Sequence, residues 1–392
     1  MRLAQAAQRM LEDRLIPFWA GLRDDENGGF YGYMDFDLNL DRRAVKGCIL
    51  NSRILWFFSE AAMATGLEVA RSCADHAWRF LRDRCLDREH GGLYWSVTFD
   101  GAPEDTTKHT YNQAFGIYAL ASYYRMTGDR EALGEARALF EVIEGRCTDE
   151  QGYLESFARD WRPEDNDKLS ENGVLAERTM NTLLHVFEGY SGLYLAAPED
   201  RVRVALLRLL DIYENKVFDP ERNRQRVFFD RDYRELIDLH SYGHDIESSW
   251  LIDWGTALLG DPALSERIGR INGLLAENIY RTAYRNHSVA NECEAGSVDQ
   301  TRVWWVQAEA VLGFVNAYHK TGEARYLEAA RDIWRYIGDT LVDPRPGSEW
   351  FWDVDEQGQP ASRKPIVEPW KCPYHNGRMC MELIRRDPDV EV

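Results

Sequence analysis

The chain has 392 residues, a formal net charge of -19 at pH 7 and 44% hydrophobic residues, so it can bury a large core in two domains or in one large barrel. The acidic charge disfavours nucleic acid and anionic membrane surfaces as partners, whereas a neutral small molecule pays no such penalty. Seven scattered cysteines predict reduced thiols, and a start unlike a signal peptide predicts a cytoplasmic protein without membrane contact.

Helical periodicity, with apolar residues three or four positions apart, recurs along the whole chain. The predicted helices lie near residues 2–20, 46–65, 68–86, 110–127, 130–147, 180–196, 199–217, 244–261, 263–284, 302–321, 324–341 and 370–385. They form pairs, because short turn-like links such as 126–129 and 320–323 alternate with longer links rich in glycine, aromatic residues and β-like runs. A helical pair that recurs about six times predicts an all-α closed toroid, since no polar capping repeat is visible at either end.

The two helices of each pair differ in polarity. Segments that start near 46, 110, 180, 244, 302 and 370 are mostly apolar with a few isolated polar residues, which is typical of an inner ring. Their partners, such as 201–208 and 323–331, have a charged face and predict an outer ring. The long links then gather, with short β-hairpins, at one end of a single domain of residues 1–392. That end is the predicted active site.

Aromatic residues crowd the predicted loops, for example at 30–33, 93–95 and 350–352. Aromatic faces at the mouth of a cleft stack on the apolar C–H faces of sugar rings, while nearby carboxylates and amides bind hydroxyl groups. Packing within the loops is the alternative explanation for any single ring. The pattern therefore favours a small carbohydrate as the ligand.

Each predicted inner helix carries a candidate functional group near its start. In chain order these are Arg53, Tyr111, His185, His244 with Glu247, Trp305 with Glu309, and Trp370 with His375. A single buried histidine or arginine is more often a hydrogen-bonded core residue than a catalyst. The recurrence around the ring favours a shared central cleft instead.

His244 and Glu247 stand three residues apart, which places both side chains on one face of a helix. The carboxylate can then orient the imidazole or stabilise its charge. A second histidine, His375, lies far downstream. Two imidazoles in one carboxylate-rich pocket suit reversible proton transfer near neutral pH. We therefore expect both histidines to act as general acid and base, with Glu247 holding His244 in the required tautomer.

Metal binding is the alternative use of these residues. His240 and His244 are four residues apart, and Cys372 precedes His375 by three, and both spacings occur in zinc sites. Neither is an HExxH motif, however, and a histidine that acts as acid or base gains nothing from ligation. We expect no metal and no cofactor, with His240 as a loop or capping residue.

Several of these segments carry a resemblance to a known family. Residues 23–32, 46–56, 180–188, 244–247, 304–309 and 371–376 resemble the signature blocks of the cellobiose 2-epimerases, within the N-acylglucosamine 2-epimerase superfamily. The resemblance implies an (α/α)6 barrel and cofactor-free, reversible epimerisation at C2 of the reducing-end sugar of a β-1,4-linked disaccharide such as cellobiose, lactose or mannobiose.

The resemblance also implies a role for each candidate residue. The catalytic set would be His244, His375, Glu247, Arg53 as the residue that binds the enediolate, and His185. The substrate-binding set would be Tyr111, Asn181, Trp305, Glu309 and Trp370, with the two tryptophans stacking on sugar rings.

Other functions are compatible with the same toroid. A glycoside hydrolase would place two carboxylates across the scissile bond, whereas Asp245, Glu247 and Glu309 come with histidines, which favours carbon-acid chemistry. An aldose-ketose isomerase, a 2-epimerase of mannose or glucose, and a non-catalytic sugar-binding toroid remain alternatives. We expect a monomer, although the sequence leaves the oligomeric state and the preferred sugar open. Loops 157–161 and 221–226 are expected to cover a second sugar ring.

Overall fold

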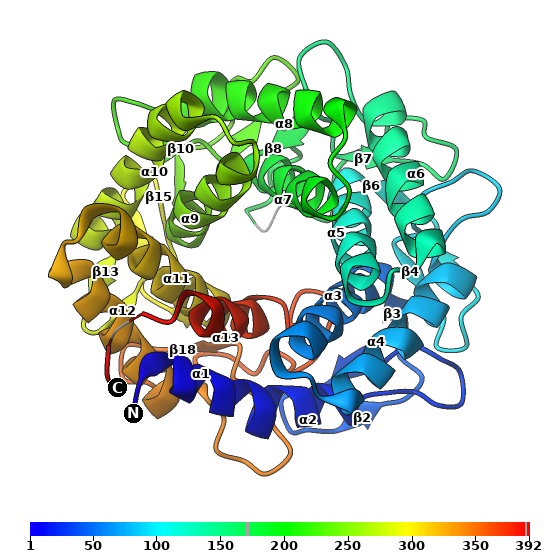
Figure 1. Cartoon of the computed structure of the whole chain (residues 1–392), viewed down its shortest axis with the longest axis horizontal. Helices are drawn as coiled ribbons and strands as arrows, with labels where there is room; N and C mark the ends of the chain where they lie inside the picture. The colour runs from blue at the N-terminus through cyan, green and yellow to red at the C-terminus, as the bar shows by residue number, and fades with distance from the viewer. Residues whose placement is uncertain (170–171, 389) are drawn as a thin grey trace.

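The structure, a computed structural model, describes residues 1–169, 172–388 and 390–392. Its helices form two concentric rings (Figure 1). The inner ring consists of α3 (Cys48–Thr65), α5 (Thr110–Thr127), α7 (Met180–Ala196), α9 (Tyr242–Leu258), α11 (Trp304–Thr321) and α13 (His375–Arg386). The outer ring consists of α1 (Leu3–Met10) with α2 (Ile16–Ala20), α4 (Glu68–Phe80), α6 (Arg130–Arg146), α8 (Asp200–Ile212), α10 (Pro262–Thr282) and α12 (Ala324–Tyr336). The predicted (α/α)6 barrel is confirmed.

Short strands occupy the long links that lead from each outer helix to the next inner helix. They are β1 (Tyr33–Met34), β2 (Leu40–Asp41), β3 (Lys46–Gly47), β4 (Ser96–Val97), β5 (Pro103–Asp105), β6 (Lys108–His109), β7 (Ser156–Phe157), β8 (Arg178–Thr179), β9 (Phe218–Asp219), β10 (Arg224–Gln225), β11 (Phe228–Phe229), β12 (Leu239–Ser241), β13 (Tyr284–Arg285), β14 (Ser288–Val289), β15 (Glu292–Glu294), β16 (Ser297–Asp299), β17 (Arg302–Val303) and β18 (Asp353–Val354). All pair antiparallel in sheets of two or three strands. The predicted hairpins are β1–β2, β4–β5, β9–β10, β13–β14 and β15–β16, whereas the other pairs join strands of successive links.

Most predicted helix boundaries lie within a few residues of the observed ones, but the last inner helix differs. It begins at His375 rather than near 370. Pro373 explains the difference, because a proline disfavours helical backbone at the residue that precedes it. Trp370 therefore lies in the loop before α13, not on the inner helix that the sequence predicted.

A repeated ion pair with a buried cation anchors the first inner helices. Asp24, Asp87 and Asp149 each begin a glycine-containing reverse loop and pair with the cation of the strand before the next inner helix: Lys46 at 2.6 Å, Lys108 at 3.1 Å and Arg178 at 2.6 Å. Each aspartate also accepts backbone N–H bonds within its own loop. Because a buried charge must be paired and hydrogen-bonded, these contacts fix where each inner helix starts.

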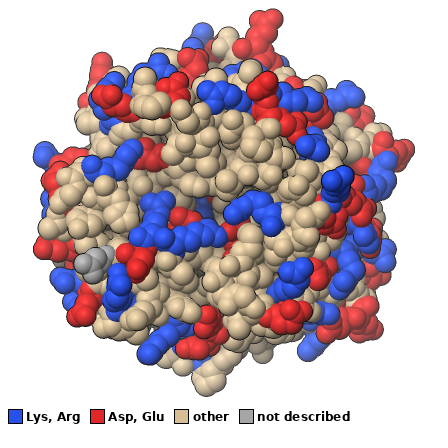
Figure 2. Space-filling view, viewed as in Figure 1, with Lys and Arg blue, Asp and Glu red and all other residues tan. Residues whose placement is uncertain are grey.

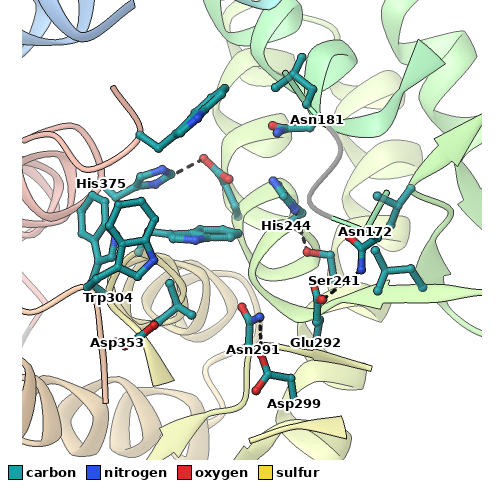
Figure 3. A pocket seen from close by; sticks show the side chains of 18 of the residues that line it. Asn172, Asn181, Ser241, His244, Asn291, Glu292, Asp299, Trp304, Asp353 and His375 are labelled. Carbon is teal, nitrogen blue, oxygen red and sulfur yellow. Dashed lines mark hydrogen bonds and ion pairs between the residues drawn. The ribbon is translucent and has the colours of Figure 1, made fainter. Parts of the chain in front are cut away.

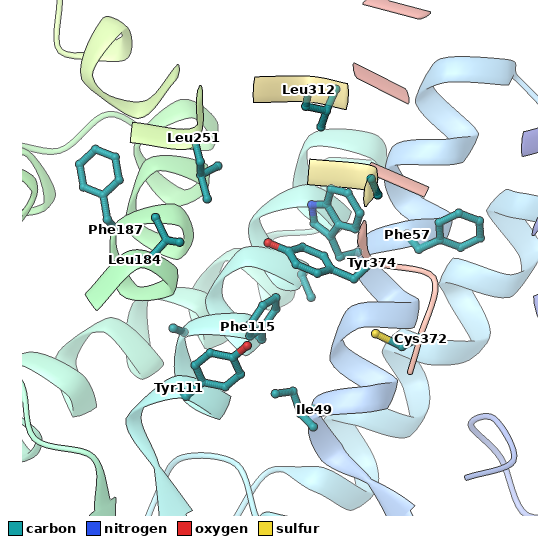
Figure 4. Close-up of a cluster of buried hydrophobic side chains, with 14 of the residues drawn as sticks. Ile49, Phe57, Tyr111, Phe115, Leu184, Phe187, Leu251, Leu312, Cys372 and Tyr374 are labelled. Atoms are coloured by element: carbon teal, nitrogen blue, oxygen red, sulfur yellow. The ribbon is translucent and has the colours of Figure 1, made fainter. Parts of the chain in front are cut away.

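The inner helices are buried on nearly every side and pack closely (Figure 4). Gly189 of α7 shows how close the packing is, since a Cβ atom there would lie 2.6 Å from the backbone oxygen of Ala114 in α5. The outer helices instead bury one face, as their amphipathic sequences predict. The core therefore lies between the two rings and within the inner ring.

The ring closes where the two ends of the chain meet (Figure 1). The backbone N–H of Leu3 donates to the carbonyl of Val390 at 2.9 Å, and the N–H of Val392 donates to the carbonyl of Met1 at 2.9 Å. Short turns join inner to outer helices at the end opposite the hairpins. Within the described residues, no helix combines the length and apolar character that crossing a membrane requires.

Candidate active site

A cavity of about 330 Å³ opens at the hairpin end of the barrel (Figure 3). Nine of the ten predicted site residues line it: Arg53, Tyr111, Asn181, His185, His244, Glu247, Trp305, Trp370 and His375. The tenth, Glu309, is fully buried and lies behind the wall. The inner ring thus brings together side chains that are more than 300 positions apart in the sequence.

His244 and His375 stand on opposite sides of the cavity (Figure 3). Trp305 contacts both imidazoles, with ring centroids 4.8 Å from His244 and 5.3 Å from His375. An indole face therefore lies between the two proton-transfer candidates. A flat ligand resting on that face would have one imidazole on each side.

The carboxylate that holds His375 is Glu309. His375 Nδ1 lies 2.7 Å from Glu309 Oε1, and Trp250 Nε1 donates to Glu309 Oε2 at 2.9 Å. An ionised carboxylate is an acceptor only, so Nδ1 of His375 donates and its Nε2 keeps a lone pair. The substrate contact predicted for Glu309 stays a prediction, since in this structure its carboxylate is fully buried and holds His375.

Glu247 does not hold His244, contrary to the spacing argument. Its Oε1 accepts from Arg378, and it lies 4.0 Å from Nδ1 of His375. His244 Nδ1 instead bonds Ser241 Oγ at 2.7 Å. The first turn of α9 directs the two side chains to different neighbours, because helix positions three apart share a face but need not touch.

His185 has its own carboxylate partner, which the sequence analysis missed. Its Nδ1 lies 2.9 Å from Glu188 Oε2, and both side chains are almost fully buried. The spacing of three residues between His185 and Glu188 on α7 could have predicted this contact, because such positions are neighbours on a helix. Two histidines of the cavity, His185 and His375, are thus each held through Nδ1 by a buried carboxylate.

Arg378, on α13, is the second residue that the sequence analysis missed. Its guanidinium donates to Glu188 at 2.5 Å, to Glu309 at 2.7 Å and to Glu247. The side chain is 2% exposed. No local sequence pattern predicts these contacts, because the partners of Arg378 lie on three other helices.

Burial and these contacts set the protonation of the site. Burial lowers the pKa of both His244 and His375 to about 3, so both imidazoles are neutral near pH 7. Burial alone would raise the pKa of Glu309, but Arg378 and His375 outweigh it and lower that pKa to about 2. Burial and the neighbouring Glu309 charge raise the pKa of Glu247 to about 8. Glu247 therefore holds a proton at neutral pH.

Arg53 supplies a permanent positive charge to the cavity. Its Nη2 donates to the hydroxyl of Tyr111 at 2.7 Å, and its guanidinium lies 4.1 Å from the ring centre of Phe115. Trp370 lies 5.8 Å from Tyr111, ring to ring, on the same wall. This wall presents a charge and aromatic faces to one ligand.

Other loops than those predicted form the outer wall. Neither 157–161 nor 221–226 contributes a described residue to the cavity. Lys168 and Asn172 contribute instead, together with the hairpin at Asn291–Asp299. Asn172 Nδ2 donates to Glu294 at 3.1 Å, so the two segments meet above the cavity. The length of a loop in the sequence could not predict which loops fold over the cavity.

The spacings that suggested zinc are used otherwise. His240 lies in β12 and bonds Asp245 at 2.8 Å, and Cys372 Sγ lies 3.7 Å from Arg53 Nη1. Among the described residues one other group could hold a metal: ligand atoms of Glu247, Glu309 and His375 lie within 4.8 Å of one another. Arg378 already donates to both of those carboxylates. A metal ion would have to displace its guanidinium.

Comparison with known proteins identifies the family of the chain. The model of the N-acylglucosamine 2-epimerase (GlcNAc 2-epimerase) family matches residues 29–376. The chain belongs to this family. It is therefore an enzyme of the isomerase class.

Relatives within the family cover nearly the whole chain. A protein named Cellobiose 2-epimerase from Eubacterium cellulosolvens is 49% identical, over 98% of this chain and 99% of its own. The solved structure of Cellobiose 2-Epimerase from Bacillus thermoamylovorans B4167 is 44% identical with a TM-score of 0.94, over 98% and 99% of the two chains. A sugar epimerase from a ruminal bacterium is 47% identical with a TM-score of 0.98, over 99% and 100%.

Proposed function

We propose that this family member reversibly epimerises C2 of the reducing-end sugar of β-1,4-linked disaccharides such as cellobiose, lactose and mannobiose. The observation that carries the proposal is the pair of neutral histidines, His244 and His375, on opposite sides of one cavity. Inversion at a carbon requires a proton to leave one face and return to the other. Two opposed imidazoles, each able to hold or release a proton, supply both steps.

The reaction begins with ring opening, because only the open-chain aldehyde makes the C2 proton acidic. Glu247, protonated at neutral pH, donates its proton to the ring oxygen while an imidazole takes the proton of the C1 hydroxyl. The C1–O5 bond breaks and a carbonyl forms at C1. Trp305 and Trp370 hold the sugar by stacking on its C–H faces.

One histidine then removes the C2 proton, and the electron pair moves to the carbonyl oxygen to give a cis-enediolate. Arg53 stabilises the negative oxygen with a permanent charge, and His185 directs a further hydrogen bond to it. The opposite histidine, which was protonated when it took the C1 hydroxyl proton, delivers that proton to the other face of C2. The scheme is symmetric, so each histidine is the base for one epimer and the acid for the other.

Incubation with cellobiose, lactose, mannobiose and mannose in deuterated water, followed by proton NMR, tests the proposal. We expect new anomeric signals of the C2 epimer and loss of the C2 proton signal, with the disaccharides reacting faster than mannose. Release of monosaccharides would indicate a hydrolase, and a ketose as the main product would indicate an isomerase. Binding without exchange of the C2 proton would contradict any catalytic role.

A further inference from the structure

Arg378 joins four neighbouring inner helices at the floor of the cavity. It lies on α13, and its carboxylate partners Glu188, Glu247 and Glu309 lie on α7, α9 and α11. All four side chains are at most 2% exposed. One guanidinium thus meets three buried carboxyl groups, and one positive charge cannot balance three negative charges where burial weakens their solvation.

The hydrogen bonds show which carboxyl group is neutral. Both oxygens of Glu188 accept bonds, from Arg378, His185 and Tyr374. Glu309 likewise accepts on both oxygens. Oε2 of Glu247 is buried and has no hydrogen-bond partner within the described part of the chain. A proton on that oxygen removes the cost of a bare buried charge, and the raised pKa of Glu247 agrees.

We propose that Arg378 is a positioning residue that keeps Glu188 and Glu309 ionised beside a protonated Glu247, and thereby holds His185 and His375 with Nε2 free to meet substrate. This inference rests on the proposed function and adds a residue to it. Because Arg378 is not among the described residues that line the substrate cavity, it acts only through these carboxyl groups.

The tautomer of His375 follows from the charge on Glu309. While Glu309 is ionised it accepts from Nδ1–H, so Nε2 of His375 carries the lone pair that takes a proton from C2. Without the guanidinium, Glu309 would be a buried acid beside another acid and would bind a proton near neutral pH. It would then donate to Nδ1, which puts the proton on Nε2 and removes the base.

A second cavity makes Arg378 accessible to a chemical test. This cavity, of about 370 Å³, opens at the end of the short turns, and Arg378, Arg125 and Arg385 are among the residues that line it. Figure 2 shows Lys and Arg side chains gathered at a hollow in the centre of this face. A small cation can therefore reach the space that a shortened residue 378 would leave, without passing through the substrate cavity.

The variants to compare are Arg378→Met, Arg378→Lys and Arg378→Ala, with Arg385→Met as the matched control. Arg385 lies on the same helix and lines the same rear cavity, but it pairs with Glu60 and Glu382, away from the substrate cavity. The charged and titratable groups around the cluster are His185, Glu188, His244, Glu247, Glu309, Tyr374, His375, Arg53, Tyr111 and Tyr118.

We expect Arg378→Met to lower kcat/KM about a hundredfold at pH 7, with activity recovering as the pH rises and Glu309 loses its proton. The acidic limb of the pH–activity profile of Arg378→Met should shift to higher pH by about one pH unit or more. Arg378→Lys keeps the positive charge but lacks the planar guanidinium fork, so its kcat/KM should lie between those of the wild type and Arg378→Met. It serves as the test if the methionine variant does not fold. About 20 mM guanidinium should raise the activity of Arg378→Ala about tenfold or more and leave Arg385→Met unchanged.

Long-range ¹H–¹⁵N NMR of protein labelled with ¹⁵N-histidine reads the tautomer without an activity assay. We expect His375 to carry its proton on Nδ1 in the wild type and on Nε2 in Arg378→Met. An unshifted pH profile, no guanidinium rescue, or an unchanged tautomer would overturn the inference. If the wild type does not epimerise any disaccharide, the proposed function fails, whereas the tautomer result still decides the role of Arg378.

Discussion

His244 and His375 carry the proposed proton transfer, so their removal should affect turnover and not folding. We expect His244→Ala and His375→Ala each to lower kcat by about a hundredfold or more, the loss typical of a missing general acid or base. Initial rates of epimer formation and circular dichroism melting measure the two effects. A variant that melts earlier but keeps its activity per folded molecule would identify that histidine as a core residue.

Arg53 is expected to act mainly in the transition state. Arg53→Lys keeps the charge but loses the planar fork that bonds Tyr111 and stacks over Phe115. Because negative charge on the oxygen develops only as the enediolate forms, kcat should fall strongly, by about tenfold or more, while KM changes little. Steady-state kinetics with cellobiose separate the two constants. An equal loss in binding and rate would make Arg53 a simple substrate anchor.

At the scale of the elements, the inner helices are positioned by close packing that has no spare volume. Gly189→Ala would place a Cβ atom 2.6 Å from the backbone of Ala114, which cannot move away without shifting α5. Overpacking of this kind costs about 1–3 kcal/mol, so Tm should fall by a few degrees, and activity should fall because His185 lies on the same helix.

The matched control for this prediction is Gly134→Ala on the outer helix α6. A Cβ atom at Gly134 would meet nothing within 4 Å, and alanine favours a helix over glycine by roughly 0.5–1 kcal/mol. Tm should therefore stay the same or rise slightly. Equal destabilisation by both substitutions would show that packing of α7 on α5 is not the cause.

For the whole molecule, buried neutral histidines predict loss of stability in acid. Burial lowers the pKa of His244 and His375 to about 3 and that of His109 to about 4, against about 6.5 in an unfolded chain. Between pH 6.5 and about 4 the unfolded chain binds protons that the folded chain does not. The free energy of unfolding should therefore fall as the pH falls through that window, and be largely unaffected by these groups above it.

Urea unfolding at pH 7.0, 5.5 and 4.5 measures this dependence. The double variant His244→Asn/His375→Asn replaces two of the three titrating groups, so its stability should fall less steeply with acid than that of the wild type. An identical slope in both proteins would assign the acid sensitivity to the carboxyl groups instead.

The sequence by itself determined the elements and indicated nine of the 25 residues that line the cavity. Periodicity of 3.6 residues and the turn residues are local properties, so the alternation of inner and outer helices could be predicted from them. His244 and His375 could be selected because each stands near the start of an inner helix. Trp370 was predicted on the last inner helix, but Pro373 disfavours helical backbone at the residue before it, so the helix begins only at His375.

Only the tertiary structure decided which groups act on one another. Glu309 and His375 are 66 positions apart, and Arg378 and Glu188 are 190 apart. These pairs meet because the ring closes and presses four inner helices together. The protonation of Glu247 then depends on burial and on the charges of neighbours from other helices. Burial and charge balance are properties of the closed barrel, and no local spacing contains them.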